Sequence, residues 1–581
     1  MLYGGILTKK PISIISFFII LTGLFFISGC NSKSIIVNTA LNIDSSFCGN
    51  RTISLEFPKD LVDPNSAQAI NLEETIFKSC PNILTFEKNQ NTNTTIYTFT
   101  LNFDSATDYI SKIETLTSRP VTVNFFCGNT PLTNGLRCEE DFDSKELFSW
   151  LYNACKNGSN LSSLDINLKC AGTKLVANGK EFWTSNKISV SNVNFQPVEK
   201  ISIYTKNNFD GTFNRTIKFS FSKETVNSLG NKLTEYMAEK TPENIGSCGW
   251  IYLDGAREYI ISYTNLNLDE LSQYTNSIFN TDSCHKICYQ TDINQSTLFK
   301  KVDVFQDSLD LSAFSSDEKN VNLEYKYDTA TEKAKQYLDG QLQDIGELCD
   351  NSFCLNTKTS GLRLYIPNST DYKIEGIDFK LNYLENNNFE KSIYLKYNKD
   401  DKEPISYTQW YLNEKNIDAE QETYEAGSNN IYKILKIGNP SEISQLGKDV
   451  FGDGNSVSYT FENYNFNIHN STKIKDNVRL SKILTGGNKT TPITYIVSPN
   501  NICTVSSLEY MINKRKIRAN TKLDSNGNIN ISLPRSDFDL ICNGRSVNQI
   551  NAILAFLLTL VVLLSVICVI LYVRHKKSKH G

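Results

Sequence analysis

Two short stretches of the chain show the same alternation of apolar and polar residues. "FCGNRTISLEF" at 47–57 and "GTFNRTIKFSF" at 211–221 both run from Arg-Thr-Ile into strict alternation. A period of two residues predicts a half-buried β-strand. A second strand is predicted at 96–103, and the other copy keeps this plan from residue 259. The pattern therefore predicts a repeated module with paired strands.

Helices are predicted after these strands, because polar capping pairs precede residues that share one apolar helical face. The pairs are Ser105 with Asp108, Asn267 with Glu270 and, between the two copies, Asp143 with Glu146. Strands around an Asn178-Gly179 turn follow at 167–183. The expected fold class is α+β, in which tandem modules of antiparallel sheet carry helices on one face.

A third copy is predicted at 377–397, because Phe389-Glu-Lys-Ser-Ile393 echoes Phe213-Asn-Arg-Thr-Ile217. The predicted boundaries are a signal peptide at 1–29, a first α+β module at 30–125, a connecting helix and strand region at 126–198, a second α+β module at 199–300, a connecting region at 301–373, a third module at 374–480, a membrane-proximal β-rich region at 481–546, a transmembrane helix at 552–573 and a basic tail at 574–581.

The C-terminal apolar block is long enough to cross a membrane. Ala552–Val573 contains 22 residues, interrupted only by Thr559 and Ser565. This length spans a hydrocarbon core of about 30 Å as a helix. Basic residues follow at 574–579, and the positive-inside rule places them in the cytoplasm. We therefore expect a single-pass protein of the cell membrane with an extracytoplasmic ectodomain and a cytoplasmic C-terminus.

The N-terminus has the order of a secretory signal, with Lys9 and Lys10 before the apolar run Pro11–Gly29. Ile27-Ser28-Gly29-Cys30 resembles the lipobox of bacterial lipoproteins, which implies lipid attachment at Cys30. An ordinary signal peptide or an uncleaved anchor is the alternative. Since a spanning helix already retains the chain, lipidation would tether the start of the ectodomain to the same membrane.

The chain has fifteen cysteines and a net charge of −4. Because positive and negative side chains are nearly equal in number, a nucleic-acid partner is disfavoured. Thirteen cysteines face an exported, disulfide-permissive compartment, and close spacing favours the pairs Cys127–Cys138, Cys155–Cys170, Cys349–Cys354 and Cys503–Cys542. The full set of candidate disulfide cysteines is Cys48, Cys80, Cys127, Cys138, Cys155, Cys170, Cys248, Cys284, Cys288, Cys349, Cys354, Cys503 and Cys542.

Candidate chemistry is sparse. The ectodomain has only two histidines, His285 and His469, which argues against most hydrolase constellations and an enzymatic role. The Cys284–Cys288 segment lacks a matching second pair for zinc, and 524–530 is better explained as a hairpin turn than as a calcium loop. We expect no cofactor, no metal site and no catalytic residues. The aromatic segment 407–415 is a candidate binding surface, and the basic segment 513–522 is a candidate for contact with anionic lipid.

Taken together, the lipobox, the repeated strand and helix segments and the terminal helix resemble the LppM-like surface lipoproteins of Gram-positive bacteria. The resemblance covers residues 30–290 and both anchors. It implies a membrane-attached cell-envelope protein with no established enzymatic activity. The expected function is non-enzymatic binding of an unknown extracellular protein or envelope polymer, with membrane lipid as the other partner. Alternatives are a cell-wall-acting enzyme and a eukaryotic type I membrane glycoprotein or adhesin.

Overall fold

The structure is a computed structural model of the full chain. It describes residues 34–63, 65–157, 167–243, 246–253, 256–279, 287–315, 320–338, 341–384, 388–462, 469–498, 504–512, 515–519, 522–526, 528–533, 537–547 and 549–578. The chain forms two compact units. Unit 1 contains Met1–Tyr289 and Phe305–Pro367, and unit 2 contains Gln290–Val304 and Asn368–Gly581.

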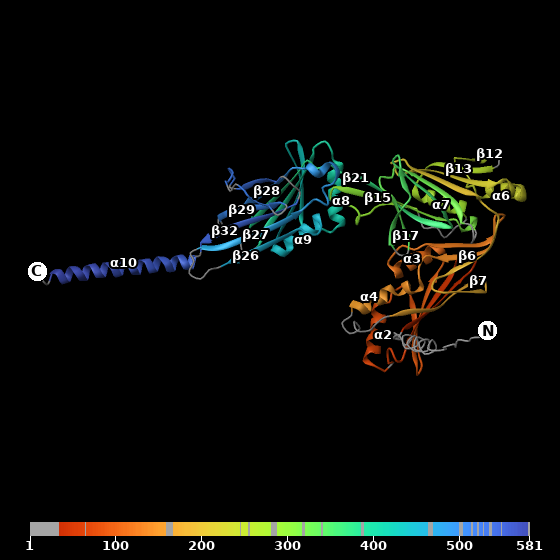
Figure 1. Ribbon diagram of the computed structural model, residues 1–581, viewed down its shortest axis with the longest axis horizontal. Coiled ribbons are helices and arrows are strands. Elements are labelled where there is room, and N and C mark those ends of the chain that lie inside the picture. Colours follow the sequence, from red (N-terminus) through yellow and green to blue (C-terminus); the bar gives the residue numbers. More distant parts are fainter. Residues whose placement is uncertain are drawn as a thin grey trace, which may run out of the picture. The chain divides into compact units, whose positions relative to one another are not determined.

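Unit 1 begins with a six-stranded sheet in the order β3-β4-β2-β1-β7-β8 and a small sheet in the order β5-β6-β9. The elements are β1 Ile35–Ile43, β2 Gly49–Pro58, α2 Ala67–Ser79, β3 Thr85–Gln90, β4 Thr94–Phe103, α3 Ala106–Thr117, β5 Val123–Asn129, β6 Thr133–Glu140, the 3-10 helix η1 Ser144–Phe148, α4 Ser149–Asn157, β7 Leu168–Ala177, β8 Lys180–Thr184 and β9 Ser189–Phe195 (Figure 1).

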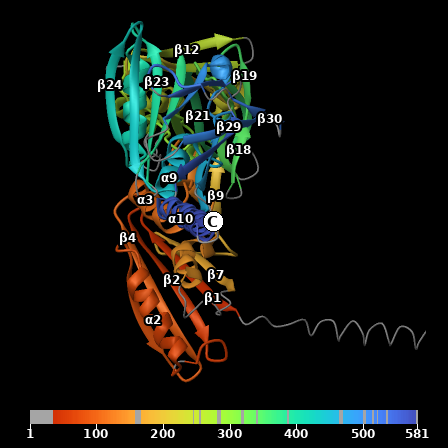
Figure 2. The ribbon, with the colours of Figure 1, turned by 90° about the vertical axis from the view of Figure 1, so that its left-hand side faces the viewer.

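Helices cover one face of this sheet, as the alternation predicts. Burial alternates residue by residue along β2, so that one of its faces packs and the other does not. Leu72 and Ile76 of α2 and Ile110 of α3 join these strands in one hydrophobic core, and Figure 2 shows α2 lying along the strands. The predicted cap at Ser105 is confirmed, since its side chain accepts a hydrogen bond from the Asp108 amide.

The next part of the chain forms a seven-stranded sheet in the order β12-β13-β11-β10-β16-β20-β19 and a sheet in the order β14-β15-β21-β17-β18. The elements are β10 Lys200–Asn207, β11 Phe213–Ser222, α5 Lys223–Leu229, α6 Asn231–Lys240, β12 Ser247–Leu253, β13 Ala256–Leu266, α7 Leu268–Phe279, β14 Cys288–Thr291, β15 Lys300–Asp310, the 3-10 helix η2 Ser312–Phe314, β16 Val321–Asp328, β17 Ala334–Leu338, β18 Gln341–Ile345, β19 Glu347–Cys349, β20 Ser352–Thr359 and β21 Gly361–Asp371.

Unit 2 contains a six-stranded sheet in the order β24-β25-β23-β22-β28-β31 and a five-stranded sheet in the order β26-β27-β32-β29-β30. Its further elements are β22 Gly376–Tyr383, β23 Phe389–Asn398, α8 Glu403–Glu414, β24 Glu420–Ala426, β25 Asn429–Gly438, α9 Pro440–Phe451, β26 Ser456–Glu462, β27 His469–Arg479, the 3-10 helix η4 Gly486–Thr490, β28 Ile493–Ser498, β29 Thr504–Ile512, β30 Arg515–Arg518, β31 Ile529–Leu533, β32 Asp537–Val547 and α10 Gln549–Ser578.

The three large sheets share a strand order when strands are counted from the start of each sheet. In each, the first strand pairs antiparallel with the second and parallel with a later strand, as β1 does with β2 and β7. The pairs β10–β16 and β22–β28 are the corresponding parallel contacts. The architecture is therefore α+β, as predicted, with one parallel pair per large sheet that alternation did not predict.

Helix α10 is the C-terminal apolar helix, and Figure 1 shows it as one uninterrupted helix. Asn551–Arg574, 24 residues, is long and apolar enough to cross a membrane. Its most apolar 18 residues have a mean hydropathy of 3.3, and none of them is buried inside the protein. A core helix of a soluble protein would instead pack its side chains on the sheet.

Candidate functional site

A buried cation occupies the third position of the second strand in each large sheet. The three residues are Arg51 in β2, Arg215 in β11 and Lys391 in β23. All three side chains are almost fully enclosed, and burial of an unpaired charge is strongly unfavourable. Each is therefore expected to have an acidic partner from a distant part of the chain.

The partner of Arg51 is Glu140, at the end of β6. Arg51 Nη1 lies 2.5 Å from Glu140 Oε1, and Tyr109 Oη donates to the same oxygen at 2.6 Å. Thr39 Oγ1 accepts from Arg51 Nε at 3.0 Å. Burial alone would lower the pKa of Arg51, but the adjacent Glu140 and Tyr109 raise it above its ordinary value.

The partner of Arg215 is Asp307 of β15. Arg215 Nη2 donates to Asp307 Oδ2, and Tyr325 Oη donates to the same oxygen at 2.5 Å. The rest of the guanidinium is used by Thr205 Oγ1 and Thr275 Oγ1, each 3.0 Å away. Both charged side chains have zero exposure, so the pair is held entirely by protein groups.

Lys391 in unit 2 is held by Asp476 of β27. Its Nζ donates to Asp476 Oδ1 and Oδ2 at 3.0 and 2.8 Å, and Tyr495 Oη donates to Oδ2. The partners in the three pairs are 89, 92 and 85 residues apart in sequence. Each buried cation of a large sheet thus pairs with an acid on a strand of a smaller sheet, β6, β15 or β27. The tyrosine that donates to the acid comes from helix α3 in the first pair and from the parallel-paired strands β16 and β28 in the other two.

The alternation of apolar and polar residues contains a signal for these buried pairs. Arg51 has the same parity as the buried Ile53, Leu55 and Phe57, so the strand pattern places it on the core face. The same parity holds for Arg215 and Lys391. A charged residue on the apolar face of a predicted strand indicates a buried ion pair, although it does not identify the acid.

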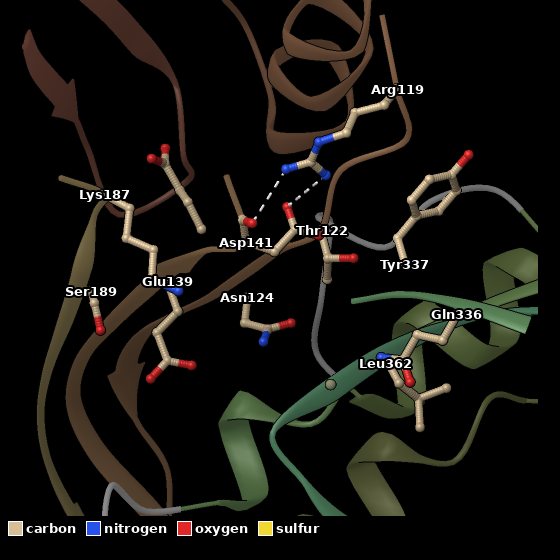
Figure 3. A pocket seen from close by; sticks show the side chains of 12 residues that line it. Arg119, Thr122, Asn124, Glu139, Asp141, Lys187, Ser189, Gln336, Tyr337 and Leu362 are labelled. Atoms are coloured by element: carbon tan, nitrogen blue, oxygen red, sulfur yellow. Dashed lines mark hydrogen bonds and ion pairs between the residues drawn. The ribbon is translucent and has the colours of Figure 1, made fainter. Parts of the chain in front are cut away.

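A polar pocket of about 400 Å³ lies within unit 1. Its walls come from the segment after α3, from β5, β6 and β9, and from β17 and β21 (Figure 3). The lining residues are Arg119, Thr122, Asn124, Glu139, Glu140, Asp141, Lys187, Ser189, Gln336, Tyr337, Gly361 and Leu362. Figure 3 shows Arg119 reaching toward Asp141, with Glu139 and Lys187 on another wall and Gln336 and Tyr337 opposite.

Three consecutive acidic residues, Glu139, Glu140 and Asp141, line this pocket where β6 ends. Burial raises the pKa of Asp141 to about 6, because the hydrogen bond with the Thr122 backbone and the charge of Arg119 only partly offset desolvation. Arg119 itself donates to Glu146 Oε2 at 2.6 Å.

Three acceptor atoms in the pocket lining have no hydrogen-bond donor within the described part of the chain. They are Asn124 Oδ1, Glu140 Oε2 and Asp141 Oδ1, and all three atoms are buried. Native proteins leave few buried polar atoms unsatisfied, and each exception requires a physical explanation. These atoms have almost no accessible surface, so a molecule in the pocket would reach them only after a rearrangement, and Asp141 Oδ1 already lies 3.9 Å from Arg119 Nη1.

The predicted disulfides are not confirmed among the described cysteines. Cys127 Sγ accepts from Asn178 Nδ2 at 3.4 Å, while Cys138 lies in the core as a free thiol. Cys155 is buried on α4, and the Cys170 thiol is 3.5 Å from the Ser185 carbonyl oxygen. In the predicted pairs Cys127–Cys138 and Cys155–Cys170, the two thiols contact different neighbours and are not bonded to each other. Close spacing in the sequence did not indicate this.

The remaining cysteines divide by position. The thiols of Cys349 and Cys354 are in contact but unbonded, and burial together with this contact raises the pKa of Cys354. Cys48, Cys80 and Cys248 are free thiols at half-buried or exposed sites. The structure does not describe Cys30, Cys284, Cys503 or the predicted signal peptide. The predicted lipid attachment at Cys30 and the predicted Cys503–Cys542 disulfide therefore lie outside the described residues.

Two other sequence candidates have a clear place. Asp524 Oδ1 accepts from the amides of Asn526 and Asn528 at 2.8 and 2.9 Å, and this arrangement is that of a turn. In the parts of the chain that the structure describes, no group of three or more His, Cys, Asp or Glu residues is placed to hold a metal ion.

The aromatic segment 407–415 is not an exposed binding surface. It belongs to α8, where Tyr407, Tyr411 and Leu412 are buried in the core of unit 2. The prediction was wrong because these residues share the helix face that packs on the sheet. The basic segment includes β30, an edge strand whose four residues are all exposed, and its contact with lipid stays a prediction.

Comparisons with known proteins give little further information. The sequence matches no protein-family model and no curated protein. Among solved structures, the folded domain of LppM from Mycobacterium tuberculosis is weakly similar, with a TM-score of 0.20 and 11% sequence identity over 31% of this chain and 97% of that domain. These comparisons do not show membership of the LppM-like family.

Proposed function

We propose that the protein is a single-pass, membrane-anchored surface protein whose ectodomain binds a ligand without enzymatic activity. The observation that carries the proposal is α10, whose apolar side chains have no partner inside the described protein. An apolar helix of this length is stable in a hydrocarbon core and unfavourable in water. The basic residues from Arg574 onward favour a cytoplasmic C-terminus and an ectodomain outside the cell.

Lipid attachment at Cys30 would add a second anchor at the start of the ectodomain. Ile35, the first residue of β1, follows Cys30 by only five positions in the sequence. A lipidated Cys30 would therefore hold the start of β1 close to the membrane surface, because five residues span at most roughly 18 Å. The bilayer lipid is then a partner at both ends of the chain.

The pocket in unit 1 supports a binding role. Its size suits a small molecule or one unit of an envelope polymer or extracellular protein. The carboxylates around it have basic partners, since Arg51 binds Glu140, Arg119 contacts Asp141 and Arg137 binds Glu139. Carboxylates held in this way are suited to fixing a ligand's orientation.

Protease treatment of intact cells tests the membrane topology. A full-length chain with a C-terminal epitope tag should lose its ectodomain to an added protease, while a tagged fragment containing α10 stays in the membrane after alkaline carbonate extraction. Permeabilised cells are the control, in which the tag should be lost too. An ectodomain that survives in intact cells, or a protein released by carbonate, would contradict the proposal.

Mass spectrometry of the mature N-terminus tests the second anchor separately. An acylated Cys30 supports a bacterial lipoprotein, whereas an unmodified start at another residue supports an ordinary signal peptide.

An envelope-acting hydrolase is the second candidate, and one observation favours it. The raised pKa of Asp141, about 6, is of the kind that a general acid uses near neutral pH, and Glu139 lines the same pocket. Incubation of the purified protein with isolated envelope polymer distinguishes the two functions. Release of soluble fragments that Asp141→Asn abolishes would support the hydrolase, and retention of intact polymer would support binding alone.

A further inference from the structure

We propose that Cys349 and Cys354 form a redox-active dithiol, which closes to a disulfide and fastens the edge strand β19 to β20. This inference goes beyond the proposed binding function, because it assigns a modification site to the ectodomain. Both residues are free thiols, of which Cys349 is exposed and Cys354 is half-buried. The two thiols contact each other through a hydrogen bond. Formation of a disulfide requires such proximity and access for the oxidant.

The pairing of the two strands brings both cysteines to one face of the sheet. Strands β19 and β20 are antiparallel, with Glu347 opposite Cys354 and Cys349 opposite Ser352. Residues two apart on a strand share a face, so Cys349 lies diagonally across from Cys354 on the same face. The turn at 350–351 has φ values of 49° and 62°, which are typical of a two-residue hairpin. Because this turn fixes the register, the thiols stay neighbours.

Strand β19 is weakly supported before the bond forms. It contains only Glu347–Cys349, all three residues are exposed, and it lies at the end of the seven-stranded sheet. Short edge strands open more readily than central strands, because few backbone hydrogen bonds hold them. A covalent bond at Cys349, the last residue of β19, would therefore keep this edge paired with β20.

Thiol–disulfide exchange supplies the chemistry, with a small-molecule or protein disulfide as the oxidant. The exposed Cys349 Sγ attacks one sulfur of that disulfide, which forms a mixed disulfide and releases the first thiol. Cys354 Sγ then attacks Cys349 Sγ, which breaks the mixed disulfide and releases the second thiol. The two cysteines together lose two hydrogen atoms with their electrons, and the oxidant gains them.

A second hairpin of the chain provides an internal comparison. Phe125 pairs with Cys138 and Cys127 pairs with Leu136, so Cys127 and Cys138 occupy the same diagonal in the β5–β6 hairpin. Cys138 is buried, however, and the Cys127 thiol accepts from Asn178. The two hairpins therefore share the register and differ in thiol contact and access. We expect only the β19–β20 hairpin to form a disulfide readily.

Peptide mapping of the purified full chain in detergent tests the proposal. The protein is incubated in a glutathione buffer with the disulfide form in excess, free thiols are blocked with iodoacetamide, and the chain is digested with trypsin. One tryptic peptide, 336–358, contains Cys349 and Cys354 and no other cysteine. This peptide should become unalkylated and lighter by two hydrogen atoms, at least about tenfold faster than Cys127 becomes linked to Cys138. A peptide that stays alkylated at both cysteines, or equal oxidation of the two pairs, would overturn the proposal.

Two variants separate the chemical steps. Cys354→Ser cannot close the bond, so Cys349 should accumulate the mixed disulfide with glutathione. Cys127→Ser, in the comparison hairpin, should leave oxidation of peptide 336–358 unchanged, and thermal melting confirms that both variants fold. Absence of the mixed disulfide in Cys354→Ser would overturn the order of attack, and slower oxidation in Cys127→Ser would overturn the pairing.

Hydrogen–deuterium exchange measures what the bond does to the strand. The amides of β19 should exchange about fivefold or more slowly in the oxidised wild type than in the reduced wild type, because the bond suppresses local opening. Equal exchange in the two forms would overturn the fastening role. Since all these measurements use purified protein, their failure is separate from a failure of the topology test.

Discussion

Replacement of Asp307 by Asn isolates the role of the buried ion pairs. Arg215 and Asp307 both have zero side-chain exposure, and two threonines accept from the guanidinium. Tyr325 donates to the same Asp307 oxygen as Arg215, and the buried Oδ1 of Asp307 has no hydrogen-bond partner among the described residues. Asn keeps the shape but removes the negative charge, which leaves the guanidinium enclosed without a counter-charge. At an effective dielectric constant of about 20 and a separation of about 3 Å, the lost attraction is roughly 5 kcal/mol. Measured losses for broken buried pairs are about 3–5 kcal/mol.

Hydrogen–deuterium exchange on the full chain in detergent measures this loss locally. A destabilisation of about 3 kcal/mol should speed exchange of the most protected amides in β11 and β15 by roughly a hundredfold. Glu324→Gln is the matched control, because Glu324 pairs with Lys200 in the same sheet but both side chains are nearly half exposed. An exposed pair contributes at most about 1 kcal/mol, so exchange should change by less than about fivefold.

A double variant separates the value of the pair from the cost of breaking it. The double variant Arg215→Met/Asp307→Leu removes both charges. Its free energy of unfolding should therefore lie closer to the wild-type value than the free energy of unfolding of either single variant does. If Asp307→Asn exchanges no faster than Glu324→Gln, the reasoning about uncompensated burial is refuted.

Three further predictions concern other parts of the chain. Because the pKa of Asp141 is raised from 3.8 to about 6 in the folded state, ionisation opposes folding as pH rises through this range. The Asp141→Asn variant should therefore be more stable than the wild type by roughly 1–2 kcal/mol at neutral pH, and equally stable below about pH 4. Thermal melting at both pH values measures this, and a stability difference that persists in acid would contradict it. Maleimide should label the exposed Cys248 before the buried Cys155, whose pKa burial raises to about 11, and mass spectrometry would detect the reverse order if the burial is wrong. Leu563→Arg places a charge near the middle of α10 at a cost of roughly 2.5–3.5 kcal/mol, so less protein should resist carbonate extraction; Leu563→Ile is the control, and equal retention of both would count against a spanning helix.

Local signals in the sequence predicted local structure well. Strands lie at Gly49–Pro58 and Phe213–Ser222, where alternation was strict. Asp143 and Glu146 form the predicted capping box, and Asn178 and Gly179 adopt the positive φ values of the predicted turn. These features depend on neighbours a few residues away, so a single stretch of sequence contains the interactions that decide them.

Contacts between distant residues were decided only by the tertiary structure. Arg51 reaches Glu140 across 89 positions, and the pocket combines β5 and β6 with β17 and β21. Tyr407 and Tyr411 are buried because their side of α8 packs in the hydrophobic core of unit 2. The sequence by itself determined the strands, the caps and the C-terminal apolar helix, since periodicity and solvent preference act along the chain. The pairing of each buried cation with its acid, and the set of residues that line the pocket, depend on contacts between strands far apart in the chain. A single sequence contains no local signal for such contacts.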